Sequence, residues 1–258
     1  MATVPPVQFQ TTDSGKFYRT LAIAMAITVV AGFSSQYLAG RSSFAARPLV
    51  HLHGIAFMGW VGLFLAQAWF ATHGPIAMHR RLGWVGAGWI VVLLIMGSWI
   101  SIDVTQRGTS PFFFRPQHFL IANPLSAIVF AALAWSAIRL RRQTDWHMRL
   151  QIAAMAAIIG PAFGRLLPMP LLIPYAFEMA GIAGLVFPLV GMIRDKRKYG
   201  HVHPAWWWGV LAILSVIPVS HLIANSDLGD AIYASVTAGH PGANVPGLEF
   251  APPPKMPE

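Results

Sequence analysis

The chain alternates long apolar runs with short polar segments, a pattern typical of a protein that crosses a membrane repeatedly. The runs of suitable length are residues 17–39, 49–72, 82–102, 118–138, 146–165, 170–193 and 204–225. A helix needs about 20 apolar residues to span the hydrocarbon core, because each residue adds only ~1.5 Å. Prolines stand where a helix can begin without losing a needed donor, at Pro48, Pro116, Pro170 and Pro204. The pattern predicts an all-α fold with seven transmembrane helices. The fifth run is the shortest and least apolar, which leaves a six-helix version open.

Composition supports this prediction and excludes other classes. Hydrophobic residues make up 55% of the chain and charged residues only 10%, whereas a soluble domain has about 25% charged residues. The absence of cysteine excludes disulfides, thiolate-bound metals, iron–sulfur clusters and cysteine nucleophiles. The net charge of +9 would suit a nucleic-acid partner. The basic residues lie between the apolar runs, however, where membrane topology explains them, so we expect no nucleic acid.

The distribution of basic residues predicts the orientation. Twelve of the 18 Lys and Arg fall on the side of the N-terminus and six on the other, which predicts a cytoplasmic N-terminus and an external C-terminus. The first 15 residues lack the features of a signal peptide. We therefore expect a cytoplasmic tail over residues 1–16, a transmembrane domain of residues 17–225 that includes a four-helix core, and an irregular external extension over residues 226–258.

Four histidines stand at the starts of four consecutive predicted helices: His53, His79, His118 and His147. Consecutive helices run in opposite directions, so His53 and His118 are expected near the outer surface, and His79 and His147 near the inner one. Two facing imidazoles in a helical bundle can hold a haem b iron on both axial positions. Two such pairs would carry electrons across the membrane. The alternative is that these histidines only cap helices or lie at the water–lipid boundary.

Glu178 is the one acidic residue well inside an apolar run. A carboxylate at that depth costs on the order of a few kcal/mol unless it is neutral, paired or next to a polar cavity. Arg165, near the end of the preceding helix, is the expected partner, either as a structural clamp or as part of a catalytic pair. The polar residues expected in the outer half are His53, Asp103, His118, Asn123, Arg165, Tyr175, Glu178 and His221. If they converge, they could bind a quinone-like headgroup, hold a metal ion or relay protons.

Two motifs carry a resemblance to a known family. HRRLGWVGAGW, which begins at His79, and WHMRLQIAAMAAIIGPAFGRLLP, which begins at Trp146, resemble the paired motifs of bacterial multi-span membrane proteins of the DUF2306 kind. The segment HLHGIAFMGW and the pair His203 and Pro204 are similar to a wider set of such proteins. The similarity covers roughly residues 50–205. It implies a multi-pass protein of the bacterial inner membrane and says little about activity.

The alternation of histidines also resembles cytochrome b561, whose di-haem four-helix core transfers electrons across membranes. This resemblance implies that His53 pairs with His118, and His79 with His147, as axial ligands. The chain departs from that family in having seven predicted spans rather than six.

Three functions remain open at this stage. The first is a b-type haem protein that moves electrons from a quinol or cytoplasmic donor to an external acceptor. The second is an intramembrane metal-dependent enzyme with His53, His118 or His221 as ligands and Glu178 as acid or base. The third is a non-catalytic membrane subunit, in a larger complex or a homo-oligomer. Its contact surface would consist of Gly54, Gly59 and Gly62.

Overall fold

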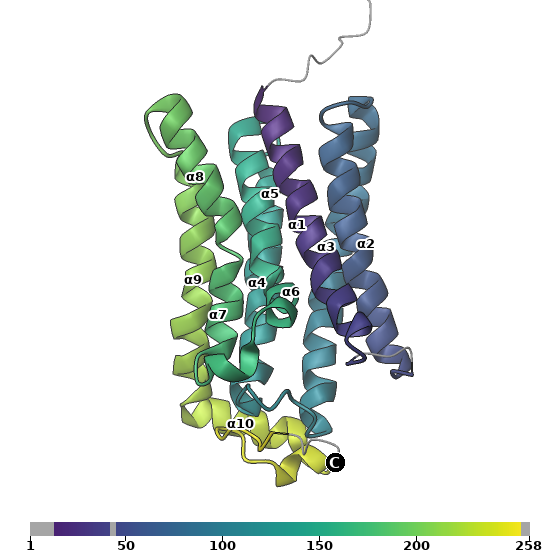
Figure 1. Cartoon of the computed structure of the whole chain (residues 1–258), viewed down its shortest axis with the longest axis vertical. Helices are drawn as coiled ribbons and strands as arrows, with labels where there is room; N and C mark the ends of the chain where they lie inside the picture. The colour runs from purple at the N-terminus through teal and green to yellow at the C-terminus, as the bar shows by residue number, and fades with distance from the viewer. Residues whose placement is uncertain (1–12, 42–44, 254–258) are drawn as a thin grey trace, which may run out of the picture.

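The computed structural model describes residues 13–41 and 45–253, and every regular element within these ranges is helical (Figure 1). The α-helices are α1 (Asp13–Leu38), α2 (Pro48–Phe70), α3 (Ile76–Gln106), α4 (Pro116–Arg139), α5 (Thr144–Ile158), α6 (Gly160–Leu166), α7 (Ala176–Ala183), α8 (Val186–Tyr199), α9 (Pro204–Ala224) and α10 (Asp227–Thr237). Two short 3-10 helices are η1 (Met169–Leu172) and η2 (Pro241–Asn244). The described residues contain no strand, which confirms the all-α prediction.

Within residues 13–41 and 45–253, six helical segments are long and apolar enough to cross a membrane. They are α1, α2, α3, α4, the stretch Ala176–Tyr199 that joins α7 and α8, and α9. Large apolar side chains are exposed on the sides of the bundle, for example Ile27 at 62%, Trp84 at 66% and Leu211 at 62%. Exposed apolar surface of this extent needs lipid or a partner to cover it. The structure therefore supports a multi-pass membrane protein.

The fifth predicted run is interrupted. The 15-residue helix α5 ends at Ile158, and the seven-residue helix α6 begins at Gly160. Pro161 stands at the start of α6. Because proline has no backbone N–H, it cannot donate the hydrogen bond that would continue α5. α6 then packs between α1 and α7 instead of continuing along α5. Neither piece is long enough to cross a membrane by itself. This agrees with the fifth run being the shortest and least apolar of the seven.

α5 lies at the centre of the bundle, in contact with α1, α4, α8 and α9. Its alanines let neighbouring helices approach closely: a Cβ added at Gly209 of α9 would overlap Ala153 of α5. A buried ion pair fixes α8 beside α5, because Arg149 donates to both carboxylate oxygens of Asp195 at 2.7 and 2.9 Å. Trp206 of α9 donates to the same carboxylate at 2.9 Å. These contacts tie three helices together near one end.

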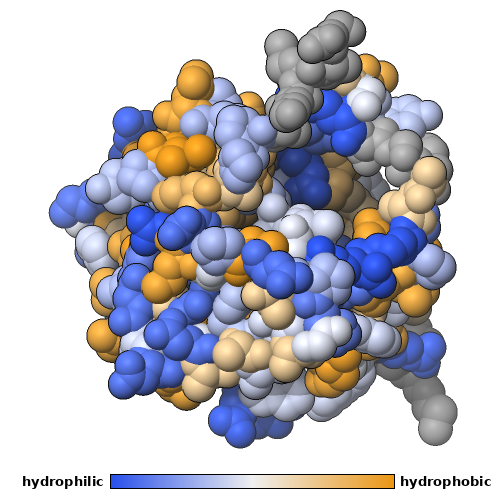
Figure 2. Space-filling view, turned by 90° about the horizontal axis from the view of Figure 1, so that it is seen from below, coloured by the Kyte–Doolittle hydropathy of each residue, from blue (hydrophilic) through white to orange (hydrophobic). Residues whose placement is uncertain are grey.

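The C-terminal extension is largely ordered, in contrast to the irregular segment predicted from its Gly and Pro content. Ser226 caps α10, which lies across the lower end of the bundle (Figure 1). Tyr233 of α10 donates to the carbonyl oxygens of Gly242 and Val245, which holds η2 against it. Seen from below, this end carries many hydrophilic residues among hydrophobic ones (Figure 2). Most of the predicted N-terminal tail, like residues 254–258, lies outside the described residues.

Candidate metal centre

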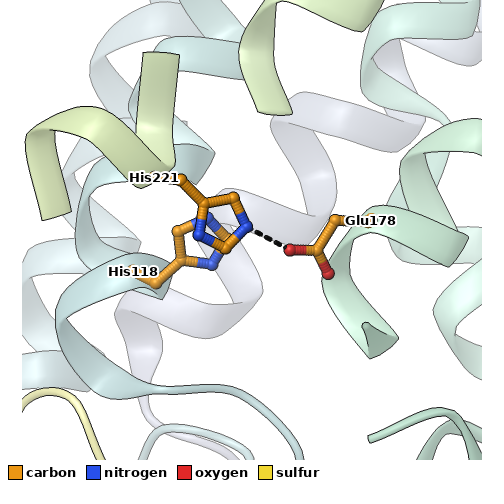
Figure 3. Close-up of side chains that lie close together, drawn as sticks. All are labelled: His118, Glu178 and His221. Atoms are coloured by element: carbon orange, nitrogen blue, oxygen red, sulfur yellow. Dashed lines mark hydrogen bonds and ion pairs between the residues drawn. The ribbon is translucent and has the colours of Figure 1, made fainter. Parts of the chain in front are cut away.

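Three metal-ligating side chains from three helices meet near the end of the bundle that α10 covers (Figure 3). They are His118 of α4, Glu178 of α7 and His221 of α9. One potential ligand atom from each lies within 4.8 Å of the others. His118 and Glu178 are buried, and the side chain of His221 is 40% exposed. Residues far apart in the sequence are therefore gathered into one compact cluster.

The three side chains contact one another directly. His221 Nε2 lies 2.5 Å from Glu178 Oε1. The rings of His118 and His221 are stacked, with centroids 4.3 Å apart and planes at 22°. His118 Nε2 is 2.9 Å from the hydroxyl oxygen of Ser220, the residue before His221. The ring of Phe177 packs edge-on against His118, with centroids 5.2 Å apart. These contacts fix the orientations of both imidazoles.

Glu178 also has an unsatisfied oxygen. Its Oε2 is buried and has no hydrogen-bond partner within the described part of the chain. Glu178 also lines a small cavity of ≈ 30 Å³, together with Ser126, Phe177 and apolar residues of α5, α7 and α9. A water molecule needs roughly 10–15 Å³. A buried carboxylate oxygen without a partner is costly, so this oxygen is suited to bind an ion or water.

Local structure explains how each ligand reaches the cluster. Pro116 begins α4, which places His118 in its first turn. The prolines at 168, 170 and 174 interrupt the chain before α7, so Glu178 falls in the first turn of a new helix, where the helix dipole favours a negative charge. His221 lies in the last turn of α9. The starts of α4 and α7 and the end of α9 thus bring the three side chains to the same end of the bundle.

The ligand set determines which ions suit the cluster. Two imidazole nitrogens and one carboxylate oxygen are the ligands of catalytic zinc sites, which keep a fourth position open. The same set forms the facial triad of non-haem iron(II) enzymes. Calcium and magnesium prefer sites made of oxygen ligands. The cluster is therefore suited to a transition-metal ion.

Arg165 does not pair with Glu178, which corrects the predicted clamp or catalytic pair. Its guanidinium lies 4.1 Å from the ring centroid of Phe33 on α1 and donates to the carbonyl oxygen of Pro161 at 2.8 Å. The reason is the break at Pro161, after which α6 packs toward α1. Glu178 is bonded instead to His221 on α9.

His53 and His118 do not face each other, so the predicted outer axial pair is also corrected. The ring of His53 stacks on Phe57 of its own helix, with centroids 4.4 Å apart. The ring of His118 stacks on His221. His118 lies in the first turn of α4 and His53 in the second turn of α2. α4 is rotated so that His118 points to α9 rather than to α2.

The other residues of the predicted outer constellation lie elsewhere. Asp103 forms an ion pair with Arg47 at 2.6 Å and another with Arg107 at 3.0 Å, which ties the end of α3 to the start of α2. The hydrogen bond to Asp103 raises the pKa of Arg47. Asn123 donates to the Phe119 carbonyl oxygen of its own helix, and Tyr175 is 63% exposed. Of the eight predicted members, the structure brings together His118, Glu178 and His221.

His79 and His147 lie next to each other at the opposite end of the bundle. Their ring centroids are 6.1 Å apart and their planes are perpendicular, at 90°. His79 Nδ1 is 3.2 Å from the Gln67 carbonyl oxygen, and His147 Nδ1 is 2.8 Å from that of Ala137. A carbonyl oxygen only accepts, so Nδ1 carries the proton in both rings. In the neutral form, Nε2 of each ring can then act as a metal ligand.

The burial of two polar residues, Ser220 and Asp195, does not follow from the hydropathy pattern. Ser220 is fully buried and bonded to His118, and its position directly before a histidine in the predicted outer half was the available clue. Asp195 stands in a run of basic residues that suggests a solvated loop. It is nevertheless buried against Arg149 and Trp206.

Comparisons with known proteins do not assign the chain to a family. No protein-family model matches it, and neither does any curated protein or solved structure. The resemblances to the DUF2306 kind and to cytochrome b561 therefore stay predictions. The function is argued from the geometry of the site.

Proposed function

We propose that this chain is a membrane metalloenzyme that binds a transition-metal ion, zinc or iron(II), through His118, Glu178 and His221. The observation that carries the proposal is the convergence of the three ligand atoms within 4.8 Å, with Glu178 Oε2 buried and unsatisfied beside them. Ligands at ~2.1 Å from a tetrahedral ion lie about 3.4 Å apart. Closing the cluster around an ion therefore needs side-chain movements on the order of 1 Å.

Three protein ligands leave a coordination position for water or substrate. A bound zinc ion lowers the pKa of its water to about 7, which creates a nucleophile, whereas iron(II) in a facial triad activates oxygen. The cavity beside Glu178 is lined by apolar residues such as Ile182, Ile213 and Ile217. At ≈ 30 Å³ this cavity has room for about two water molecules, which suits a metal-bound water.

The orientation is part of the proposal. The chain crosses the bacterial inner membrane seven times, with α5 and α6 together forming the fifth passage and the N-terminus in the cytoplasm. In this topology, the metal centre lies toward the outer surface, because His118 begins a helix that runs inward. α10 covers the centre from outside.

Metal analysis of the purified protein tests the proposal. We expect about one transition-metal ion per chain by elemental mass spectrometry, and loss of this ion in His118→Ala, His221→Ala and Glu178→Gln. Asn123→Ala is the matched control, because Asn123 lies on the helix of His118 and donates to the Phe119 carbonyl oxygen of that helix. Failure of the native chain to bind zinc, iron(II) or cobalt(II) under saturating conditions would exclude the proposal.

A second candidate function is electron transfer by a haem bound between His79 and His147. Two imidazoles on opposite sides of one iron, with Fe–N bonds of ~2 Å, have ring centres about 6 Å apart. The 6.1 Å between these two rings supports this function. We rank this function second because His53 and His118 do not form the outer pair. A second haem site near the outer surface, which electron transfer across the membrane would need, is therefore not formed by these residues. A reducible Soret band that disappears in His79→Ala tests it.

A further inference from the structure

A groove of ≈ 670 Å³ lies at the end of the bundle opposite the metal centre. It is lined by Phe17 of α1 and by Val190, Ile193, Arg194, Arg197 and Lys198 of α8. Both helices pack against α5. The groove thus brings together one aromatic residue, two aliphatic residues and three cations.

The residues from α8 form one stripe of that helix. Val190, Ile193, Arg194 and Arg197 are spaced at i, i+3, i+4 and i+7, so they share a face. The stripe begins apolar and ends basic. Val190 is 41% and Ile193 52% exposed, so both present apolar surface to the membrane. The groove therefore has an apolar zone within the bilayer and a cationic zone at its edge.

Arg194 is the cation held most firmly. Its guanidinium lies 4.4 Å from the ring centroid of Phe17 and donates to Ser14 Oγ at 3.1 Å. One of its terminal nitrogens, Nη1, is buried and has no hydrogen-bond partner in the described ranges. The nearest acid is Asp195, 3.8 Å from that nitrogen. Phe17, Ser14 and Asp195 thus hold the Arg194 guanidinium in place as a fixed cation at the wall of the groove.

We propose that this groove binds an anionic phospholipid. The phosphate-bearing headgroup accepts hydrogen bonds from Arg194, Arg197 and Lys198, and an acyl chain lies against Phe17, Val190 and Ile193. Charge complementarity selects the headgroup, because arginine binds phosphate with several aligned donors. The adjoining apolar zone selects a lipid over free phosphate. Basic pockets between helices at a membrane surface have the geometry required for such headgroups.

Lipid binding by the purified full-length protein tests the inference. Native mass spectrometry and thermal unfolding in detergent are compared after addition of phosphatidylglycerol, cardiolipin or phosphatidylcholine. We expect the anionic lipids to be retained and to raise the Tm, and phosphatidylcholine not to do so. In Arg194→Gln/Arg197→Gln, the affinity for the anionic lipids should fall, by roughly fivefold for each lost cation.

A matched control removes two other exposed cations at the same end of the molecule, in Arg139→Gln/Arg142→Gln. Anionic-lipid binding should stay at the native level there, because neither residue lines the groove. Equal losses in the two double variants would overturn the inference in favour of a diffuse surface charge. An equal response to phosphatidylcholine would overturn it as well.

A third variant separates lipid from free phosphate. Ile193→Ser changes the apolar zone at an exposed position and keeps all three cations. It should weaken lipid retention while Arg194 and Arg197 remain in place. If this variant binds lipid as the native chain does, and inorganic phosphate displaces that lipid, the site recognises phosphate alone and the lipid assignment is wrong. Size-exclusion chromatography and circular dichroism confirm that each variant is folded.

Discussion

Glu178 and His221 lie 43 positions apart in the sequence, and their side chains are bonded across the interface of α7 and α9 at 2.5 Å. The bond joins the first turn of one helix to the last turn of another. Both residues are also proposed metal ligands. Changes to either residue therefore test the contact and the function together.

Glu178→Gln should weaken metal binding strongly. The amide has a similar shape but no charge, so the variant loses the carboxylate ligand and the charged oxygen that is bonded to His221. Residues that bond to a metal ligand, without touching the metal, change the metal affinity by about 10–100-fold. Loss of a ligand itself should lower that affinity by at least as much. Competition with a chromophoric chelator measures the affinity. Asp103→Asn is the control: it removes a carboxylate bonded to Arg47 and Arg107 and should leave the affinity unchanged.

Ser220→Ala should weaken metal binding less than loss of a ligand. The hydroxyl is 2.9 Å from His118 Nε2 and fixes the orientation of that ring. We expect a loss of about tenfold in affinity, since second-sphere partners orient the ligands, and about 1 kcal/mol in stability for one buried hydrogen bond. Ser220→Thr keeps the hydroxyl and should restore part of the affinity. An affinity equal to that of the native chain in Ser220→Ala would show that the hydroxyl does not position His118.

Asp195→Ala should destabilise the bundle by about 3–5 kcal/mol, because it leaves the Arg149 guanidinium buried without its main partner. The side chains of Arg149 and Asp195 are only 3% and 1% exposed. Denaturant unfolding in detergent measures the change. Asp145→Ala removes the other acid near Arg149, which is 72% exposed, and should cost at most ~1 kcal/mol. Similar losses in both variants would contradict the role assigned to the buried pair.

The cap of α9 should make stability depend on pH. His203 Nδ1 accepts a hydrogen bond from the Ala205 backbone N–H at 3.2 Å, which requires the neutral ring. Burial lowers the pKa of His203, so the folded state binds fewer protons there than the unfolded state, whose histidine pKa is about 6.5. The contribution is present above that value and is lost as the pH falls below it. In His203→Asn, which caps without titrating, the decrease in Tm between pH 8 and pH 5 should be smaller.

Cysteine labelling should report the proposed orientation. The chain contains no cysteine, so every label marks the introduced residue. In intact cells, an impermeant thiol reagent should label Ala238→Cys, which follows α10, and should not label Lys196→Cys in α8 until the membrane is opened. Both positions are exposed in the structure. The opposite result would reverse the topology and move the metal centre to the cytoplasmic side.

Hydropathy located most helices closely, because the length and polarity of a span depend on local sequence. The expected runs 49–72 and 204–225 correspond to Pro48–Phe70 and Pro204–Ala224. Two runs depart from the structure. The missing N–H of Pro161 ends one helix and starts another within run 146–165, and run 170–193 begins as the short helix η1, so that its α-helix starts only at Ala176. The direction that the chain takes after Pro161 depends on how α6 packs against α1 and α7. The periodicity of the sequence does not predict that packing.

The candidate site was only partly predictable. The depth of a side chain in the membrane follows from its position along a helix, but the rotation of that helix about its own axis does not. His118 was expected near the outer surface, yet its partner is His221 rather than His53. The rotation of α4 is set by its packing against α3, α5 and α9. Glu178 was likewise expected to pair with the nearest arginine in the sequence. Tertiary packing placed His221 closer.

The ligands occur in the chain in the order His118, Glu178 and His221, and the last of them lies in α9. During biosynthesis, the ribosome must therefore translate the chain through α9, and that helix must insert, before the third proposed donor exists. A nascent or prematurely terminated product that ends before α9 has only two of the three donors. Under the proposed function, the ion can therefore be loaded only after α9 has been inserted.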